Sequence, residues 1–199
     1  KPQGKTPFNQ VPNYINHVHH EEPYNDFSRQ SLLPYRLSQL GPGVAWGDLD
    51  SDGDDDLALP SGRGGNFSVF VNNDGNFNEI KAGITYHDQT GVLIYPSSSG
   101  PEILVGHSNF ESDIREKSFI QGYKLEGKSL VTTRRISTNF SSLGALCMAD
   151  VDSDGDLDLF AGGRSIPGRY PKPASSMLFV NENGIFVPDS INNVNLADI

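Results

Sequence analysis

Residues 48–56 read DLDSDGDDD, and residues 150–158 read DVDSDGDLD. In both stretches carboxylates stand at positions 1, 3, 5 and 9, glycine stands at position 6, and apolar residues follow at once. A cation of the size of calcium takes about six to eight oxygen ligands, and a short loop supplies them by turning alternate side chains inward. The two stretches are therefore predicted to be calcium loops, each holding one Ca²⁺ ion.

Each loop is expected to bind its ion through four carboxylates and one backbone carbonyl. Gly53 and Gly155, at position 6, allow the sharp turn because glycine enters positive φ without steric cost. The expected ligands are the side chains of Asp48, Asp50, Asp52 and Asp56 with the carbonyl of Asp54, and the side chains of Asp150, Asp152, Asp154 and Asp158 with the carbonyl of Asp156.

Repulsion between the carboxylates is the physical reason to expect a cation. Two carboxylates about 4 Å apart repel each other by roughly 4 kcal/mol at an effective dielectric constant near 20. The alternative is a solvated acidic turn that holds no ion. Two copies of one layout favour the calcium loop.

The residues around the loops predict strands rather than helices. An EF-hand would need a bidentate Glu at position 12, where this chain has Leu59 and Ala161. The flanking runs, such as GVAWGD before the first loop and DLDLFAGG after the second, are short and apolar and are bounded by glycine or proline. Each loop is therefore expected to join two strands.

An internal repeat of about 50 residues organises the chain. Units begin at Gly43, Gly91 and Gly144, and each ends in a hairpin turn such as NNDGN at 72–76. About four short strands per unit are typical of β-propeller blades. We expect an all-β partial propeller of three blades or slightly more, with a lead-in segment at 1–40, a calcium blade at 41–90, a degenerate blade at 91–142, and a calcium blade at 143–199 that includes the start of a next unit.

The middle unit and the lead-in lack the aspartate pattern. The loop at 96–101 reads PSSSGP, so no calcium is expected there. The lead-in is expected to pack on the domain edge through apolar residues at 27, 32–34 and 37. Cys147 is expected in the core, and Trp46 is expected to be a core or blade-packing aromatic. A zinc site is an alternative for the cluster His17, His19, His20, Glu21 and Glu22, although its spacing fits no standard site.

Composition narrows the classes of function. The formal net charge is −10, whereas a nucleic-acid-binding protein needs a basic stripe. The single cysteine excludes a disulfide framework. The sequence contains no apolar run long enough to be a transmembrane helix. Loop sites of this kind fill where calcium is near millimolar, which favours an extracellular location.

The two loops resemble the pattern D-x-D-x-D-G-x-x-D of the FG-GAP or VCBS repeat family, whose calcium-bearing blades also build the integrin α-subunit propeller. The runs DFSRQSLLPYRLSQLGPGVAWGD and DLDLFAGGRSIPGRYPKPASSMLFVNENGIF are similar to the cartilage-acidic-protein-like group found on bacterial cell surfaces. The resemblance implies a surface protein, outer-membrane associated if bacterial. Such propellers have about seven blades, so the chain is expected to be part of a larger protein or assembly.

Three functions remain open from the sequence. The first is a non-enzymatic binding or scaffold module with structural calcium, whose partner is a protein, a glycan or an outer-membrane complex. The second is a propeller hydrolase or lyase, and the third is a calcium-dependent glycan-binding protein. The polar groups considered for catalysis are His87, Asp88, His107, Arg164, Arg169 and Tyr170.

Overall fold

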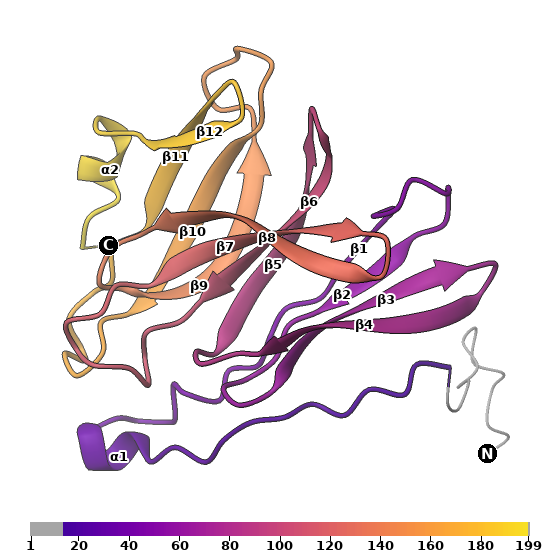
Figure 1. Cartoon of the computed structure of the whole chain (residues 1–199). Coiled ribbons are helices and arrows are strands. Elements are labelled where there is room, and N and C mark those ends of the chain that lie inside the picture. Colours follow the sequence, from indigo (N-terminus) through magenta and orange to yellow (C-terminus); the bar gives the residue numbers. More distant parts are fainter. Residues whose placement is uncertain (1–13, 199) are drawn as a thin grey trace, which may run out of the picture.

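The computed structural model describes residues 14–198 and shows an all-β protein. Its strands form three antiparallel sheets of four strands each (Figure 1). This confirms the predicted all-β class and the predicted four-stranded units. Two helices, α1 (Asp26–Arg29) and α2 (Asn192–Asn195), are four residues long. Within residues 14–198, no helix has the length and apolar character needed to cross a membrane.

The sheets follow one another along the chain, and in each one the strands are paired in sequence order. The first sheet contains β1 (Ala45–Gly47), β2 (Asp56–Leu59), β3 (Asn66–Asn73) and β4 (Asn76–Ile84). The middle sheet contains β5 (Gln89–Ser97), β6 (Gly100–His107), β7 (Phe119–Glu126) and β8 (Ser129–Ser137). The last sheet contains β9 (Ser142–Ala149), β10 (Asp158–Ser165), β11 (Met177–Glu182) and β12 (Ile185–Pro188).

Tight turns close the hairpins where the sequence predicts them. Asp74 and Gly75 between β3 and β4 have φ values of 51° and 84°, and Asn183 and Gly184 between β11 and β12 have 55° and 88°. Two successive residues with positive φ form a type I′ turn, whose twist matches that of the flanking strands. These turns confirm the hairpin predictions in the first and last units.

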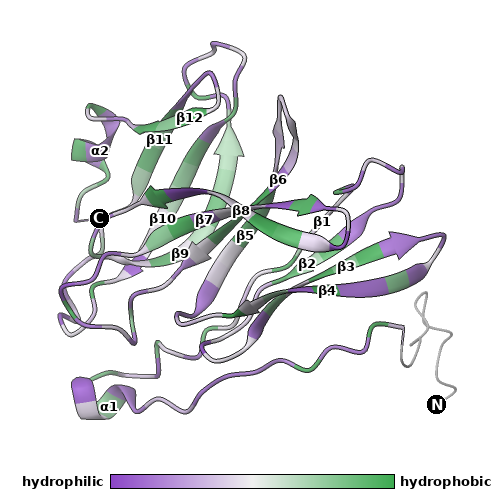
Figure 2. Ribbon diagram, in the orientation of Figure 1, coloured by the Kyte–Doolittle hydropathy of each residue, from purple (hydrophilic) through white to green (hydrophobic). Residues whose placement is uncertain are grey.

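The middle sheet lies between the other two and has an apolar core on each face. One core joins it to the first sheet and contains Val69, Ile103 and Tyr123. The other joins it to the last sheet and contains Leu104 and Phe179. Strand β5 packs beside both β1 and β9, so the first strands of the three sheets are neighbours. Figure 2 shows apolar residues along these strands and hydrophilic residues at their ends.

The lead-in segment runs along the outer face of the first sheet (Figure 1). The ring of His17 meets Phe70 edge-on at 6.0 Å between centroids. Farther on, Leu33 and Leu37 pack with Phe110 in a third, small apolar cluster. Of the apolar residues predicted to anchor this segment, only these two leucines are buried.

Phe27, Leu32 and Pro34 are exposed, so the prediction that they anchor the lead-in is wrong. The short helix α1 and the bend after it turn only Leu33 and Leu37 toward the protein. A polar group fixes the bend instead. The carboxylate of Asp26, which is fully buried, accepts hydrogen bonds from the backbone N–H of Leu37 at 2.6 Å and of Ser38 at 2.9 Å.

The last sheet has an apolar face on the side away from the middle sheet. Cys147 and Phe160 are paired across β9 and β10, and Val180 and Val187 are paired across β11 and β12. Cys147 is exposed, which corrects the prediction that it is a core residue. Its side chain lies on the face that has no further sheet against it within residues 14–198.

Trp46 is also exposed, with 54 % of its surface accessible, so of its two expected roles the core position is wrong. It lies on the outer face of the first sheet and contacts Phe77 edge-on, with ring centroids 6.1 Å apart. The core face of β1 is provided instead by Ala45, which packs against the cluster shared with the middle sheet.

We predict that Asp26→Ala loosens the bend after α1. The substitution leaves two buried N–H groups without their charged acceptor, at a cost of about 2 kcal/mol or more. Hydrogen exchange of the Leu37 and Ser38 amides should become roughly thirtyfold faster. Asp113→Ala, at an exposed carboxylate paired with Arg115, serves as the control and should leave these amides unchanged. Equal protection in Asp26→Ala and wild type would contradict the anchoring role.

Candidate metal centres

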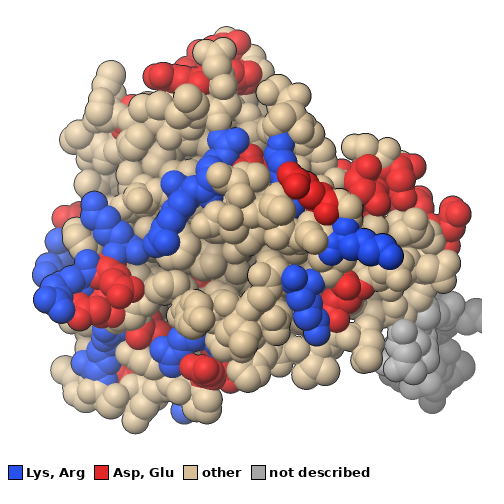
Figure 3. All heavy atoms as spheres, viewed as in Figure 1, with Lys and Arg blue, Asp and Glu red and all other residues tan. Residues whose placement is uncertain are grey.

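The two acidic loops have the same backbone shape although they lie in different sheets. They connect β1 to β2 and β9 to β10. Ser51 and Ser153, at position 4, both have a φ of 65°, and Gly53 and Gly155 have φ values of 99° and 97°. In Figure 3 acidic side chains gather over these two connections. The repeated sequence therefore produces a repeated conformation.

Three carboxylates converge in each loop. Oxygen atoms of Asp48, Asp50 and Asp56 lie within 4.8 Å of one another in the first loop. In the second loop the same holds for the three corresponding residues, at positions 1, 3 and 9. Oxygen-only ligand sets of this size suit hard divalent cations such as calcium. The residues of the second group are Asp150, Asp152 and Asp158.

The remaining predicted ligands lie outside these groups of side chains. Asp52 accepts a hydrogen bond from the backbone N–H of Asp54 at 2.9 Å. Asp154 does the same for Asp156 at 2.8 Å. The carboxylates at position 5 thus stabilise the turn of the loop. For Asp54 and Asp156 the sequence predicts only backbone carbonyl ligands. The carboxylate of Asp54 instead accepts a hydrogen bond from the backbone N–H of Asp74.

The carboxylate at position 9 joins each loop to the adjacent hairpin. Asp56 is fully buried and accepts hydrogen bonds at 2.8 Å from the backbone N–H groups of Leu49 and Asn72. Asp158 accepts the equivalent pair from Val151 and Asn181, also at 2.8 Å. Position 9 therefore fixes the end of the loop through hydrogen bonds to two separate pieces of backbone.

Crowding of negative charge disturbs the ionisation of the loops. Burial and the nearby carboxylate of Asp52 raise the pKa of Asp50. Burial also raises the pKa of Asp56, against two backbone hydrogen bonds that lower it. The pKa of Asp152 is raised as well, by desolvation and then by the carboxylates around it. A cation placed among these groups would relieve the repulsion.

The connection at the same place in the middle sheet is different. Strand β5 ends at Ser97 and β6 begins at Gly100, so only two residues lie between them. The nearest carboxylate in the sequence, Glu102, has a side chain that is 0 % exposed and paired with Arg134 at 2.9 Å. This unit therefore keeps its four strands while its connection has become a tight turn.

A third group of carboxylates was missed by sequence reasoning. Glu21, Asp88 and Glu111 bring oxygen atoms within 4.8 Å of one another. They come from the lead-in, from the β4–β5 connection and from the β6–β7 connection. The one feature of the sequence that points to this group is the glycine-rich run GRGG at 62–65, beside which the lead-in lies. A Cβ atom at Gly62 would clash with the carboxylate of Glu21 and would lie 2.8 Å from the backbone carbonyl of His20, so glycine is required for the close approach of the lead-in.

The predicted histidine and glutamate cluster at 17–22 does not come together as one site. His17 lies on Phe70, and His19 is 3.4 Å from Glu21. Glu22 pairs with Arg63 at 3.0 Å. Among residues 14–198 no histidine takes part in a group of three potential metal ligands. Only Glu21 from this cluster joins other acidic side chains.

The groups considered for catalysis do not gather in one site. His87 and His107 line one pocket, with ring centroids 6.3 Å apart. Arg164 lines a small pocket together with Glu21 and Asp88. Arg169 lines a different pocket, and the backbone of Tyr170 forms two hydrogen bonds with the side chain of Gln30. The two arginines therefore do not form a pair that could grip one anion.

His107 is buried, with 5 % of its surface exposed, and neither ring nitrogen has a hydrogen-bond partner. Its ring stacks on Phe119 with centroids 4.4 Å apart. Burial, followed by the nearby charges of His87 and Arg135, lowers the pKa of His107 to about 3. The neutral imidazole is therefore the form that the folded protein accommodates.

We predict that His107 makes the protein sensitive to acid. The folded-state pKa of about 3 lies below the ordinary value of 6.5, so the unfolded chain binds the extra proton between these values and stability falls as the pH drops. Between pH 7.5 and pH 5, the titration of His107 should lower the free energy of unfolding by about 2 kcal/mol. Urea unfolding of wild type and His107→Leu in chelator at both pH values measures it.

The His107→Leu protein should show a weaker loss between pH 7.5 and pH 5 than wild type. Phe119→Leu is the matched control, because it removes the stacked ring but keeps the imidazole, and it should retain the pH dependence. Equal pH dependence in wild type and His107→Leu would show that His107 does not titrate in this way.

Comparisons with known proteins do not assign the chain to a family. No protein-family model matches the sequence, and no curated protein matches it either. What the chain does must therefore be inferred from the placement of its own residues. The strongest such placement is the repeated convergence of three aspartates at one end of two sheets.

Proposed function

We propose that this chain is part of a calcium-binding β-propeller that serves as a non-enzymatic binding or scaffold module at a cell surface. The observation that supports it best is the pair of equivalent aspartate groups. Asp48, Asp50 and Asp56 repeat the positions and backbone geometry of the group that contains Asp150 and Asp152. Two independent copies of one carboxylate arrangement favour a shared ligand.

Calcium suits these groups better than zinc. Each group offers only carboxylate oxygens, which are ligands for calcium, magnesium or manganese, whereas zinc prefers sites with nitrogen or sulfur. Calcium also tolerates irregular ligand geometry, and a loop with exposed members such as Asp50 and Asp152 can complete its shell with water.

The proposed role of calcium is structural. The ion would cancel repulsion in the loop and leave unchanged the two hydrogen bonds by which Asp56 ties the loop to Leu49 and Asn72. Loop, strand β2 and the β3–β4 hairpin would then form one unit. A ligand that binds only the folded state stabilises it by mass action.

The order of the sheets supports a propeller. Strands β1, β5 and β9 lie next to one another on the inside, and each sheet runs outward from its first strand to its fourth. On the apolar face of the last sheet, Cys147 and Phe160 occupy the positions that Ala45 and Ala58 use in the first sheet to pack on the middle one. This correspondence favours a further sheet on that face.

The proposed location follows from calcium availability. Exposed loop sites of this type have dissociation constants on the order of 0.1 to 1 mM, so they fill outside cells or in a periplasm. A partner at such a surface would be a protein or a glycan. The formal charge of −10 makes nucleic acid an unsuitable partner.

We predict that Asp50→Asn and Asp152→Asn each remove one calcium ion from the protein. In calcium at about one hundred times the dissociation constant, an occupied loop stabilises the folded state by about 2.7 kcal/mol, and most of this should be lost. Calorimetric titration gives the number of ions, and melting curves in calcium and in chelator give the stabilisation.

Asp55→Asn is the matched control. It removes one negative charge from the first loop at position 8, where the second loop has Leu157, and Asp55 is outside the convergent group. This variant should keep its ion. If wild type binds no calcium, or melts at the same temperature in calcium and in chelator, the two loops are solvated acidic turns and the proposed function fails.

A further inference from the structure

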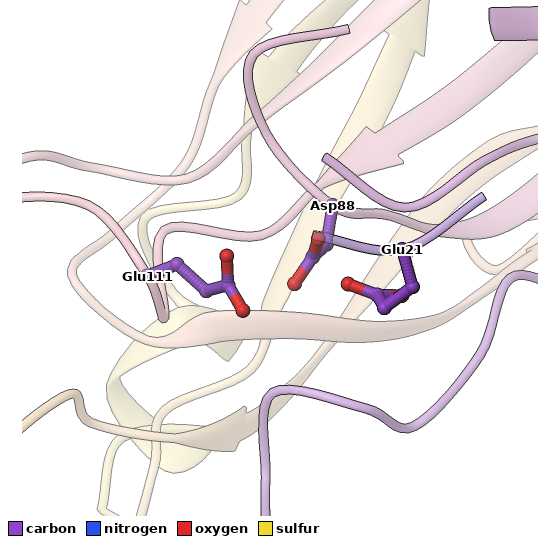
Figure 4. A group of neighbouring side chains, drawn as sticks. All are labelled: Glu21, Asp88 and Glu111. Atoms are coloured by element: carbon purple, nitrogen blue, oxygen red, sulfur yellow. The ribbon is translucent and has the colours of Figure 1, made fainter. Parts of the chain in front are cut away.

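A third acidic group lies at the opposite end of the sheets from the two aspartate loops. Antiparallel pairing places the β1–β2 connection at one end, and the β2–β3, β4–β5 and β6–β7 connections at the other. Asp88 belongs to the β4–β5 connection and Glu111 to the β6–β7 connection, and the lead-in brings Glu21 between them. Figure 4 shows the three carboxylates turned toward one another.

Glu111 is buried without adequate hydrogen bonding. Its side chain is 4 % exposed, and its Oε1 atom has no hydrogen-bond partner among residues 14–198. Oε1 of Glu21 is likewise buried and unpartnered. Buried polar atoms are hydrogen-bonded in the great majority of cases, so unpartnered oxygens on two carboxylates of one group indicate a missing ligand.

The positive side chains around the group also do not balance its negative carboxylates. Arg63 places its Nε atom 3.0 Å from Glu22 and 3.2 Å from Glu111, and its backbone N–H donates to Asp88 at 2.9 Å. Arg164 lines the pocket that contains Glu21 and Asp88. The carboxylates of Glu21, Glu22, Asp88 and Glu111 therefore outnumber the guanidinium groups beside them, which favours binding of a cation at this point.

Burial raises the pKa values of two members of the group. Burial, followed by the neighbouring charge of Asp88, raises the pKa of Glu21 to about 7. The same two causes raise the pKa of Glu111 to about 7, although Arg63 opposes them. A cation bound among the three carboxylates would favour their ionised forms.

We propose that Glu21, Asp88 and Glu111 form a third cation site, which takes one hard divalent cation such as calcium or magnesium. The ligands that converge are carboxylate oxygens only, which such cations prefer. The group includes no nitrogen or sulfur ligand of the kind that zinc selects.

The ion would act as a clamp between three segments that are distant in sequence. The lead-in is already held to the first sheet by the hydrogen bond from Glu22 N–H to Arg63 C=O, at 3.2 Å. A cation shared by Glu21, Asp88 and Glu111 would add ionic bonds from the lead-in to the middle sheet. Binding at this site therefore controls how firmly the lead-in lies on the protein.

Glu111→Gln tests the proposal, with Asp113→Asn as the matched control. Glutamine keeps the shape of the side chain and removes one ligand charge, whereas Asp113 lies two residues away, exposed and paired with Arg115. Native mass spectrometry of the full chain, titrated with Ca²⁺ and separately with Mg²⁺, counts the ions. We expect Glu111→Gln to hold one ion fewer than wild type with at least one of the two metals, and Asp113→Asn to match wild type.

The difference in ion count between wild type and Glu111→Gln does not depend on whether the two aspartate loops bind calcium. Loops that bind nothing would lower the wild-type count, yet the difference of one ion between wild type and Glu111→Gln would remain. Glu21→Gln provides a second variant with the same expectation if Glu111→Gln does not fold. A folded glutamine variant that holds as many ions as wild type with both metals overturns the proposal.

Hydrogen exchange provides a second readout. In wild type, the metal that the count identifies should slow exchange of the Glu22 amide several-fold relative to chelator. In Glu111→Gln the same metal should have no such effect, whereas Asp113→Asn should behave as wild type. An equal effect of the metal in wild type and in Glu111→Gln would overturn the clamp.

Discussion

The structure depends on a buried carboxylate that each acidic loop directs into the protein. Asp56 and Asp158 use both oxygens to accept backbone N–H groups, one from the start of the loop and one from the strand that leads into the next hairpin. A carboxylate that accepts several N–H groups is stable when buried. Three separate pieces of chain are thereby fixed around one side chain, and the other aspartates are arranged from it.

Features encoded over a few residues could be predicted from the sequence. The type I′ turns at Asp74–Gly75 and Asn183–Gly184 depend on two adjacent residues, and the four-stranded units follow from short apolar runs between such turns. The acidic loops were recognised for the same reason. The sequence could not show that Asp52 and Asp154 lie outside the convergent groups and accept hydrogen bonds within the loop, because the same spacing allows a side chain to bind an ion or to cap its own turn.

Features that depend on contacts between units could not be predicted. Cys147 and Trp46 lie in apolar runs, but the burial of a strand residue depends on what lies against its face of the sheet. Glu21, Asp88 and Glu111 are more than twenty residues apart from one another. These three carboxylates come together only because the lead-in runs along the first sheet and the first two sheets pack against each other. No short sequence pattern predicts either arrangement.

The position of the lead-in gives the row of sheets two unlike ends. At one end the apolar face with Phe160 and Val180 is open, whereas at the other the segment around His17 lies on Phe70. Two complementary open ends would let copies of the chain stack head to tail, into a ring or a fibre. Because the lead-in lies on one of these surfaces, it leaves less of that surface free for such a contact.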